Sequence, residues 1–346
     1  MPKRVLVTGA NGTIGNAVAR AFVRAGWTTY GLVRREKSLV SLQAEEIIPL
    51  LGSPGDLSFI ESLHATDKSL DVIVSTTESW PDYVSHYNEI INFVRTLAVA
   101  SNEVGTRPLV LFTSGCKDYG TAARHGEANL APHTESSPLN PPTFLQDRTT
   151  HAIKIFDHND LFDAAVLRPT TIFGLHASFY GPVLEVGAAA AERGVLEISS
   201  PSNSIMHGLH VDDCGEAYVA LAEHSDRAAV SGQCFNVSGR TYETAQQIVQ
   251  ALVTEYQVKD GFRFLDPSSE SSSALVKPND SIFDFTQWVE SDKIRKLTGW
   301  RDRRPLFTEG IHAYRLAYEA AVKSESENVA KLKQFMKVIS GSGGFS

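Results

Sequence analysis

A glycine-rich turn near the start of the chain restricts the possible folds more than any other feature. An apolar, β-branched run at residues 3–7 leads into Gly9, Gly12 and Gly15, and an amphipathic helical pattern follows. This strand–loop–helix order is what a dinucleotide phosphate site needs. Gly9 would permit the tight turn, Gly12 the close approach of the backbone to pyrophosphate, and Gly15 the packing of helix on strand. The sequence therefore predicts a dinucleotide site, with a plain strand-to-helix turn as the alternative.

The helix after this turn contributes to the same prediction. Its N-terminus would present free N–H groups and a partial positive charge to the phosphates. We therefore expect the cofactor to contact the loop and the first helical turn, through Gly9, Asn11, Gly12, Thr13, Ile14 and Gly15.

Length and composition fit a soluble globular protein with a large core. The chain has 346 residues, of which 42% are hydrophobic and 21% are charged, and these values are ordinary for that class. The length allows one Rossmann-type domain with a smaller lobe. The formal net charge of −8 argues against a nucleic-acid or anionic-membrane partner, so we expect a small-molecule substrate.

The cysteines and the targeting patterns indicate a cytoplasmic protein. Cys116, Cys214 and Cys234 lie far apart without a C-x-x-C spacing, so neither a disulfide framework nor a zinc site is predicted. No charged-then-apolar leader precedes Val5. No stretch approaches the roughly 18 apolar residues of a transmembrane helix. We therefore expect no membrane association and no metal.

The first half of the chain alternates strand and helix patterns. Strands are predicted at 4–8, 28–33, 46–50, 71–76, 108–113 and 164–168, and helices near 13–25, 57–64, 84–103 and 147–158. Such alternation predicts βαβ units. The expected fold class is α/β, a Rossmann-type doubly wound parallel sheet with a smaller C-terminal substrate lobe. Residues 116–143 are rich in Gly, Pro, Asn and His and are predicted to form a long loop, which at this length is more often functional than structureless.

The pattern loosens after Arg168, and this change sets the predicted domain organisation. Helices are expected at 181–194, 212–224, 241–256 and 305–323, with short strands at 195–198, 205–211 and 233–237. We assign residues 1–174 to an NAD(P)-binding domain, to which residues 205–238 return, residues 175–204 and 239–330 to the substrate lobe, and residues 331–346 to a C-terminal tail.

The end of the second predicted strand selects between the two nicotinamide cofactors. An acidic residue there would bind the ribose 2′-OH, whereas arginine would accommodate a 2′-phosphate. The strand at 28–33 is followed by Arg34 and Arg35, and two guanidinium groups could clamp a phosphate. We therefore predict that NADP(H) is preferred over NAD(H). Solvated surface arginines are the alternative.

A carboxylate after the third predicted strand is a further candidate cofactor contact. Gly55 is followed by Asp56 and Leu57, and the Asp56 carboxylate could accept a hydrogen bond from the adenine amino group. An aspartate before a helix also satisfies free N–H groups as an N-cap. The two roles are compatible.

Motifs along most of the chain resemble one enzyme family. They are Thr8–Gly15, Gly55–Leu57, Asp71–Val74, Thr113–Gly120, Leu167–Gly174, His210–Asp213, Phe235–Ser238, Gly299–Trp300 and Glu309–Gly310. In this order and spacing the chain is similar to the extended short-chain dehydrogenase/reductase superfamily, in particular to the NAD-dependent epimerase/dehydratase family. The resemblance implies a Rossmann domain with a substrate lobe over the nicotinamide end. It also implies cofactor contacts from Thr76, Arg148, Pro169, Thr170 and Ile172.

The catalytic motif is where the sequence departs from this family. The family uses Tyr-x-x-x-Lys on the helix before the Arg-Pro strand, with the tyrosine as general acid/base. Counting back from Arg168 places Phe144 at the tyrosine position and Arg148 at the lysine position, and none of the ten tyrosines has a lysine four residues later. Phenylalanine cannot supply a proton, whereas Arg148 can still hydrogen-bond ribose hydroxyls. The motif is therefore predicted to be missing, as in the atypical branch of the superfamily.

Other side chains could replace the missing acid. The family's helper hydroxyl falls on Gly115, one residue after Ser114. Tyr180 follows the segment where the family's chain enters the substrate lobe. We predict Ser114, Tyr180 and Arg148 as catalytic residues. Further candidates, each with packing as the alternative, are Tyr119, His151, Lys117 and Cys116.

The histidines His207 and His210 do not predict a metal site. Their odd spacing on one strand points them to opposite faces. The segment His210–Asp213 is expected instead to end a strand and cap the next helix.

The predicted function is that of an NADP(H)-binding, short-chain dehydrogenase/reductase-like enzyme with a non-standard active site. We expect a small, hydrophobic carbonyl or enone-type metabolite as substrate, because Trp80, Phe144, Phe179 and Tyr180 could line the pocket. One alternative is a non-redox isomerase, cyclase or lyase on the same fold, and another is an inactive nucleotide-sensing regulator. The resemblance also implies a homodimer through the helices expected at 84–103 and 147–158.

Overall fold

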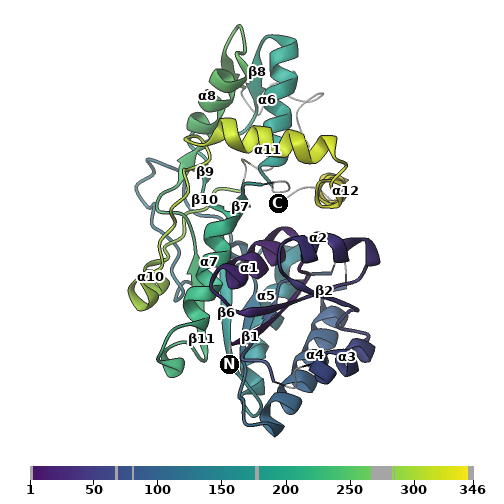
Figure 1. Cartoon of the computed structure of the whole chain (residues 1–346). Coiled ribbons are helices and arrows are strands. Elements are labelled where there is room, and N and C mark those ends of the chain that lie inside the picture. Colours follow the sequence, from purple (N-terminus) through teal and green to yellow (C-terminus); the bar gives the residue numbers. More distant parts are fainter. Residues whose placement is uncertain are drawn as a thin grey trace.

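The computed structural model describes residues 3–66, 69–79, 82–175, 179–265, 283 and 285–341. A large sheet flanked by helices forms one part of the molecule, and a smaller lobe stands over one edge of that sheet (Figure 1). The last helix, α12 (Glu327–Gly341), lies between the two parts. No helix among the described residues is long and apolar enough to cross a membrane.

The described residues form a sheet of seven parallel strands in the order β11–β6–β5–β4–β1–β2–β3. Strand β1 pairs with β2 on one side and with β4 on the other, so the strand order reverses beside β1. The carboxyl ends of the strands at such a reversal are where open α/β sheets bind ligands. The fold class predicted from the sequence is confirmed. The strands are β1 (Arg4–Thr8), β2 (Thr28–Val33), β3 (Ile48–Leu51), β4 (Val72–Ser75), β5 (Leu109–Thr113), β6 (Asp163–Pro169) and β11 (Gln233–Val237).

Different helices cover the two faces of the sheet, because side chains alternate along each strand. Val5 and Val7 of β1 belong to a core cluster that includes α1 and α7. Leu6, between them, belongs to a cluster on the other face that includes α3, α4 and α5. These helices are α1 (Thr13–Arg24), α3 (Ile60–Thr66), α4 (Tyr83–Glu103), α5 (Gln146–Ala152) and α7 (Val211–Ala222). The short helix α2 (Leu39–Ala44) follows β2.

The smaller lobe has its own core, in which side chains of α6, α8 and α11 pack with Phe173 and Phe307. Three two-stranded ladders, β10–β7, β12–β9 and β13–β8, complete it. The elements of the lobe are α6 (Gly181–Arg193), α8 (Ala245–Tyr256), α11 (Ile311–Lys323), β7 (Thr171–Phe173), β8 (Leu196–Ile198), β9 (Ile205–Met206), β10 (Gly208–His210), β12 (Glu243–Thr244) and β13 (Phe262–Phe264). Helix α10 (Asp292–Thr298) packs instead beside β11 and α7, and its Ile294 belongs to the core of the large sheet.

Two predicted segments differ from the structure in an informative way. The helix expected at 147–158 is α-helical only as far as Ala152, the end of α5, and continues as the 3₁₀ helix η5 (Ile153–His158); the short turn η4 (Thr143–Leu145) directly precedes α5. Residues 331–341, expected in a tail, belong to α12, while residues 342–346 lie outside the described residues. The predicted loop at 116–143 contains one short turn, η3 (Cys116–Tyr119), and is otherwise irregular. The division into domains stays a prediction.

Candidate functional site

A cavity of about 460 Å³ opens at the carboxyl edge of the sheet, where the smaller lobe and α12 face it. It is lined by residues from the start of α1, the ends of β4, β5 and β6, and α5. Eleven residues predicted from the sequence line it: Thr13, Ile14, Thr76, Ser114, Cys116, Lys117, Arg148, Pro169, Thr170, Ile172 and Phe179. Candidates that are not among its lining residues are Gly9, Asn11, Gly12, Gly15, Arg34, Arg35, Asp56, Leu57, Tyr119, Phe144, His151 and Tyr180.

The glycine-rich loop explains why α1 can begin so close to the sheet. Gly9 has a φ of +63°, in the left-handed region that favours glycine. A Cβ atom on Gly15 would lie 2.3 Å from the carbonyl oxygen of Gly9 and 2.6 Å from Oγ1 of Thr76. Thr76 is itself fixed, because its hydroxyl donates to the carbonyl of Thr8 at 2.6 Å. Glycine at position 15 therefore permits the close packing of α1 against β1 and β4.

The polar groups at this loop fit a dinucleotide. Gly12 is the N-cap of α1 and provides no side-chain cap, while Thr13 and Ile14 of the first turn line the cavity. The hydroxyl of Thr170 is buried without a hydrogen-bond partner and also faces the cavity. Uncapped N–H groups and a buried hydroxyl both call for a polar ligand. The first turn of α1 could hold a pyrophosphate, and the Thr170 hydroxyl could hydrogen-bond another polar group of the same ligand.

Basic side chains gather beyond the end of β2 and meet α12. Arg35 Nη2 lies 2.6 Å from Glu327 Oε2, and Lys37 pairs with the same carboxylate. Burial, together with the charges of Arg35, Arg34 and Lys37, lowers the pKa of Lys331 on α12. We call Arg34, Arg35, Lys37 and Lys331 the basic cluster. Four cations held this close together repel one another and favour a bound anion.

Asp56 lies after β3 and caps the short turn η2 (Leu57–Phe59). Its carboxylate accepts a hydrogen bond from the backbone N–H of Ser58 at 3.0 Å, and this bond lowers its pKa. The capping interpretation of Asp56 is confirmed. Its contact with an adenine amino group stays a prediction.

A buried carboxylate organises the end of the cavity that lies beside β5. Asp118 is fully buried and accepts hydrogen bonds from Ser114 Oγ at 2.5 Å and Arg148 Nη2 at 2.8 Å. It also accepts from Thr149 Oγ1 at 2.8 Å, and Arg168 Nε lies 3.4 Å away. Several donors compensate the cost of burying this charge. The single hydroxyl proton of Ser114 is thus donated to Asp118 and is not directed at a ligand.

The two departures from the family motif that lie in the cavity wall are coupled in space. A Cβ atom on Gly115 would lie 3.2 Å from Nη2 of Arg148, which is tighter than ordinary packing. The wide guanidinium therefore occupies room that a larger side chain at position 115 would need. Arg148 is held by Asp118 and lies 3.7 Å from Glu78, and its charge stays at the carboxyl end of β5.

Tyr180 and Phe144 do not face this cavity. Tyr180 is 1% exposed and packs in the lobe core, with its ring centroid 4.5 Å from that of Phe307. Burial raises the pKa of its phenol, which disfavours proton transfer. Phe144 lies in η4 and is partly buried. Of the other expected pocket aromatics, Phe179 lines the cavity, and Trp80 lies outside the described residues.

Three further candidates have structural partners. Tyr119 donates to Asn236 Oδ1 at 2.8 Å and accepts from Arg168 at 3.0 Å. Cys116 lines the cavity, but its thiol donates to the carbonyl of Arg168 at 2.8 Å, and burial raises its pKa. His151 pairs with the backbone carbonyl of Asp147 at 2.8 Å. None of these three side chains offers an available proton to the cavity.

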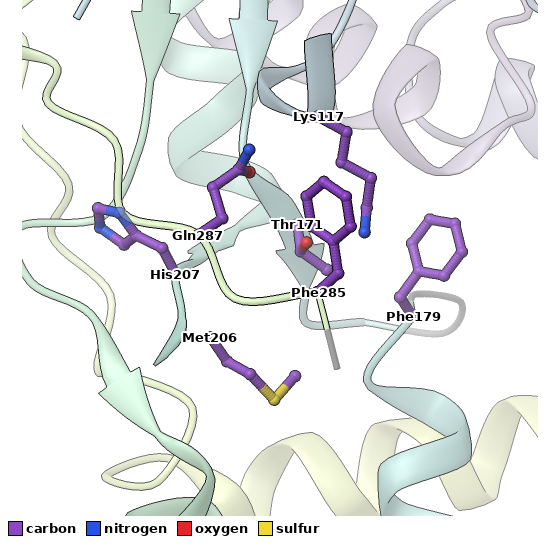
Figure 2. Close-up of a pocket in the computed structure, with 7 residues that line it drawn as sticks. All are labelled: Lys117, Thr171, Phe179, Met206, His207, Phe285 and Gln287. Atoms are coloured by element: carbon purple, nitrogen blue, oxygen red, sulfur yellow. The ribbon is translucent and has the colours of Figure 1, made fainter. Parts of the chain in front are cut away.

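The remaining candidate is Lys117. It follows β5 in η3, lines the main cavity, and also lines the small adjoining cavity shown in Figure 2. Its ammonium lies 3.8 Å from the ring centroid of Phe285. Burial and, to a lesser degree, the charge of Arg148 lower the pKa of Lys117 to about 7.

Sequence reasoning missed the residues that α12 and the lobe contribute. Asn328, Lys331 and Leu332 line the cavity, and the Asn328 side chain donates to the backbone carbonyl of Asn11 at 2.9 Å. Tyr83 and Gln287 also line it. The amphipathic run after Glu327 was the available signal for α12.

The two histidines of the predicted strand have separate roles. His207 pairs with the carbonyl of Gly239 at 3.0 Å, while His210 caps α7 by accepting from the N–H of Asp212 at 3.1 Å. The expected cap at His210 is confirmed. In the part of the chain that the structure describes, no group of three or more His, Cys, Asp or Glu residues could hold a metal ion.

The parallel sheet, the glycine-rich loop before α1 and the cavity beside it are the features of a Rossmann-type nucleotide-binding enzyme. The sequence profile of the NAD dependent epimerase/dehydratase family matches residues 5–238. The chain belongs to this family. It is also 26% identical over 231 residues to an uncharacterized protein of Schizosaccharomyces pombe, an alignment that covers 66% of this chain and 73% of that protein.

Solved structures support the same fold. A dTDP-glucose 4,6-dehydratase from Bacillus anthracis in complex with NAD superposes with a TM-score of 0.68 at 16% identity, covering 93% of this chain and 98% of the other. A UDP-glucose 4-epimerase from Bifidobacterium longum in complex with NAD⁺ and UDP gives 0.65 at 15% identity, covering 94% and 99%. At sequence identities this low, the structural similarity shows a shared fold alone.

Proposed function

We propose that the protein is an NADP(H)-dependent oxidoreductase that acts on a small, apolar carbonyl or enone-type metabolite. The observation that carries the cofactor preference is the basic cluster. Arg34 occupies the position directly after β2, where an acidic residue would accept from a ribose hydroxyl. Arg35, Lys37 and Lys331 surround the same point.

Glu327 supports this proposal because it already pairs with two members of the cluster. Its carboxylate contacts Arg35 and Lys37, and the Lys37 contact chiefly lowers its pKa. One carboxylate carries a single negative charge, whereas a phosphate monoester carries about −1.5 to −2 at neutral pH. A 2′-phosphate would therefore interact with the four cations more strongly than Glu327 does. The uncharged 2′-hydroxyl of NAD(H) could not compete with Glu327 for these cations.

The residues of the cavity have distinct roles toward such a cofactor. The first turn of α1 would hold the pyrophosphate, and Arg148, fixed by Asp118 at 2.8 Å, would hydrogen-bond the ribose on the nicotinamide side. The orphan hydroxyl of Thr170 would accept or donate one hydrogen bond at the inner end. When bound, the reduced nicotinamide supplies a hydride.

The substrate end has apolar walls. Ile172, Phe179 and Leu332 line the main cavity, and Met206 and Phe285 line the small cavity beside it (Figure 2). Apolar lining with a few polar groups is typical of sites for small organic ligands. These walls favour an apolar metabolite over a polar sugar.

Charge reversal in the basic cluster tests the proposal. We expect Arg34→Glu/Arg35→Glu to weaken NADPH binding by about a hundredfold, two steps of 1.4 kcal/mol, and to change NADH binding little. Fluorescence titration of both nucleotides measures this. Arg301→Glu, an exposed position after α10, is the matched control and should behave like the wild type. Equal losses for both nucleotides, or no loss, would contradict the proposed preference.

A screen for turnover tests the reaction class. The wild-type protein should oxidise NADPH in the presence of apolar ketones or diketones such as benzil. Tight NADPH binding with no turnover across ketones, aldehydes, quinones and enones would instead favour a nucleotide-binding regulator.

A further inference from the structure

The backbone around Lys117 is fixed from both sides. The side-chain amide of Gln287 donates to the carbonyl of Cys116 at 2.6 Å and to that of Gly120 at 3.2 Å. These carbonyls flank η3. Asp118, the next residue, is fixed by four side chains. Lys117 therefore starts from a rigid turn at the carboxyl end of β5, and a rigid turn can position a reacting group precisely enough for proton transfer.

The Lys117 side chain extends from that turn toward the substrate end. In Figure 2 its amine lies between the rings of Phe179 and Phe285, which line the same small cavity. It lines the same cavity as Thr170 and Ile172 of the nicotinamide-side segment. An apolar carbonyl compound between these rings would lie beside the Lys117 amine.

Among the residues that the structure describes, few charged or titratable groups line the two cavities around Lys117. Of the groups that line the main cavity, Arg148 and Lys331 are cationic and Glu78 is anionic. Tyr83 and Cys116 carry a charge only after they lose a proton, and burial raises the pKa of both. His207 lines the small cavity, and burial lowers its pKa to about 4, so it is neutral at pH 7. Glu78 lies toward Arg148, 3.7 Å from its guanidinium. The surroundings therefore favour a lysine that loses its proton near neutral pH.

We propose that Lys117 is the general acid/base of this enzyme, in place of the absent motif tyrosine. This inference rests on the proposed function. As the carbonyl carbon of the substrate receives a hydride, the π electron pair of the C=O bond moves to oxygen, which takes a proton from the Lys117 ammonium. The products are an alcohol, the oxidised nucleotide and a neutral Lys117 amine, which regains its proton from water. Oxidation of an alcohol follows the reverse path.

The protonation of Lys117 can be measured without any substrate. We expect acetic anhydride to acetylate Lys117 in the nucleotide-free protein with a half-maximal rate near pH 7, as followed by peptide mass spectrometry. The exposed Lys259 serves as the internal reference within the same protein. A midpoint for Lys117 that equals that of Lys259 would overturn the inference.

Two variants separate charge from proton transfer. Lys117→Arg keeps the positive charge but cannot release a proton, and Lys117→Met removes both. We expect each variant to lower single-turnover reduction of benzil by NADPH about a hundredfold or more, the range of general acid catalysis, while NADPH affinity stays within about twofold. The exposed Lys154→Arg is the matched control and should retain the wild-type rate.

The outcomes distinguish this inference from the proposed function. A wild-type rate that falls as pH rises above about 7, lost in Lys117→Arg with NADPH binding intact, supports Lys117. Retention of a third or more of the rate in Lys117→Arg overturns the role of Lys117 and leaves the proposed function standing. Failure of the wild type to bind NADPH overturns both.

Discussion

The glycine-rich loop before α1 and the turn after β5 border the same cavity but depend on different parts of the chain. At the glycine-rich loop, main-chain atoms and small residues set the geometry, as at Gly15, where a Cβ would lie 2.3 Å from the backbone. At the turn after β5, long side chains from separate elements meet on Asp118. The glycine-rich loop is formed by residues that are close together in the sequence, whereas the turn after β5 depends on residues from distant parts of the chain.

This difference explains why membership of the family indicates nucleotide binding but does not identify the group that supplies a catalytic proton. A nucleotide phosphate is recognised by backbone N–H groups, which any sequence with the right glycines can supply. A proton must come from a particular atom with a suitable pKa. The two ends can therefore vary independently, and at the second end Gly115 leaves the room that the Arg148 guanidinium occupies.

The largest effect is expected from Asp118→Asn. Removing one partner of a buried ion pair costs about 3–5 kcal/mol, because Arg148 and Arg168 would remain buried near a neutral amide. Chemical denaturation measures the loss. Asp292→Asn, which breaks an exposed pair with Lys296, is the control and should cost no more than about 1 kcal/mol. Equal losses would show that Asp118 does not organise this end.

Two substitutions in the glycine-rich loop should affect different properties, one mainly the stability of the fold and the other mainly NADPH binding. Gly15→Ala forces the backbone apart and is expected to cost about 1–3 kcal/mol of stability. Gly12→Ala brings its Cβ to 3.1 Å from the carbonyl of Gly9 only, so it should weaken NADPH binding about tenfold with less loss of stability. Thermal melts and titrations separate the two. Normal NADPH binding by Gly12→Ala would contradict the proposed role of this loop in holding the cofactor.

The titration of Lys117 should also appear in the stability of the protein. Because the folded-state pKa is lowered to about 7, the unfolded chain holds this proton more tightly between about pH 7 and pH 10.4. Stability from this group is therefore gained as pH rises through that window, by at most about 1.4 kcal/mol per pH unit. Lys117→Met should flatten this rise, as seen in denaturation at several pH values. An identical slope in both proteins would contradict the shift.

Removal of the carboxylate that pairs with the basic cluster should have a smaller effect. Glu327→Gln leaves Arg35 and Lys37 available to a phosphate, so NADPH should bind about two- to fivefold more tightly and NADH equally well. Glu319→Gln, at an exposed position of α11, is the control. Tighter binding of both nucleotides would point to a movement of α12 rather than to charge.

The smallest effect is expected from Phe144→Tyr. Phe144 is not among the residues that line the cavity, so a hydroxyl there should change benzil reduction by no more than about twofold. A large gain in the rate of benzil reduction would show that the side chain at position 144 reaches the substrate.

The sequence predicted the parts of the molecule whose determinants are local. The alternation of strands and helices and the loop from Gly9 to Gly15 gave the fold and the start of the site, and the cap at Asp56 followed from its position before a turn. Lys117 was only one of several candidates, because its burial depends on Phe285 and Gln287, far away in the chain. The contribution of α12 to the cavity depends on ion pairs between Glu327 and residues 35 and 37, which no spacing rule reveals.

The most direct test of the central claim is the ratio of the NADH and NADPH dissociation constants of the wild-type protein, measured by titration calorimetry. The basic cluster beyond β2 predicts that NADPH binds at least about tenfold more tightly, a difference of about 1.4 kcal/mol. Equal affinities, or tighter binding of NADH, would contradict the account.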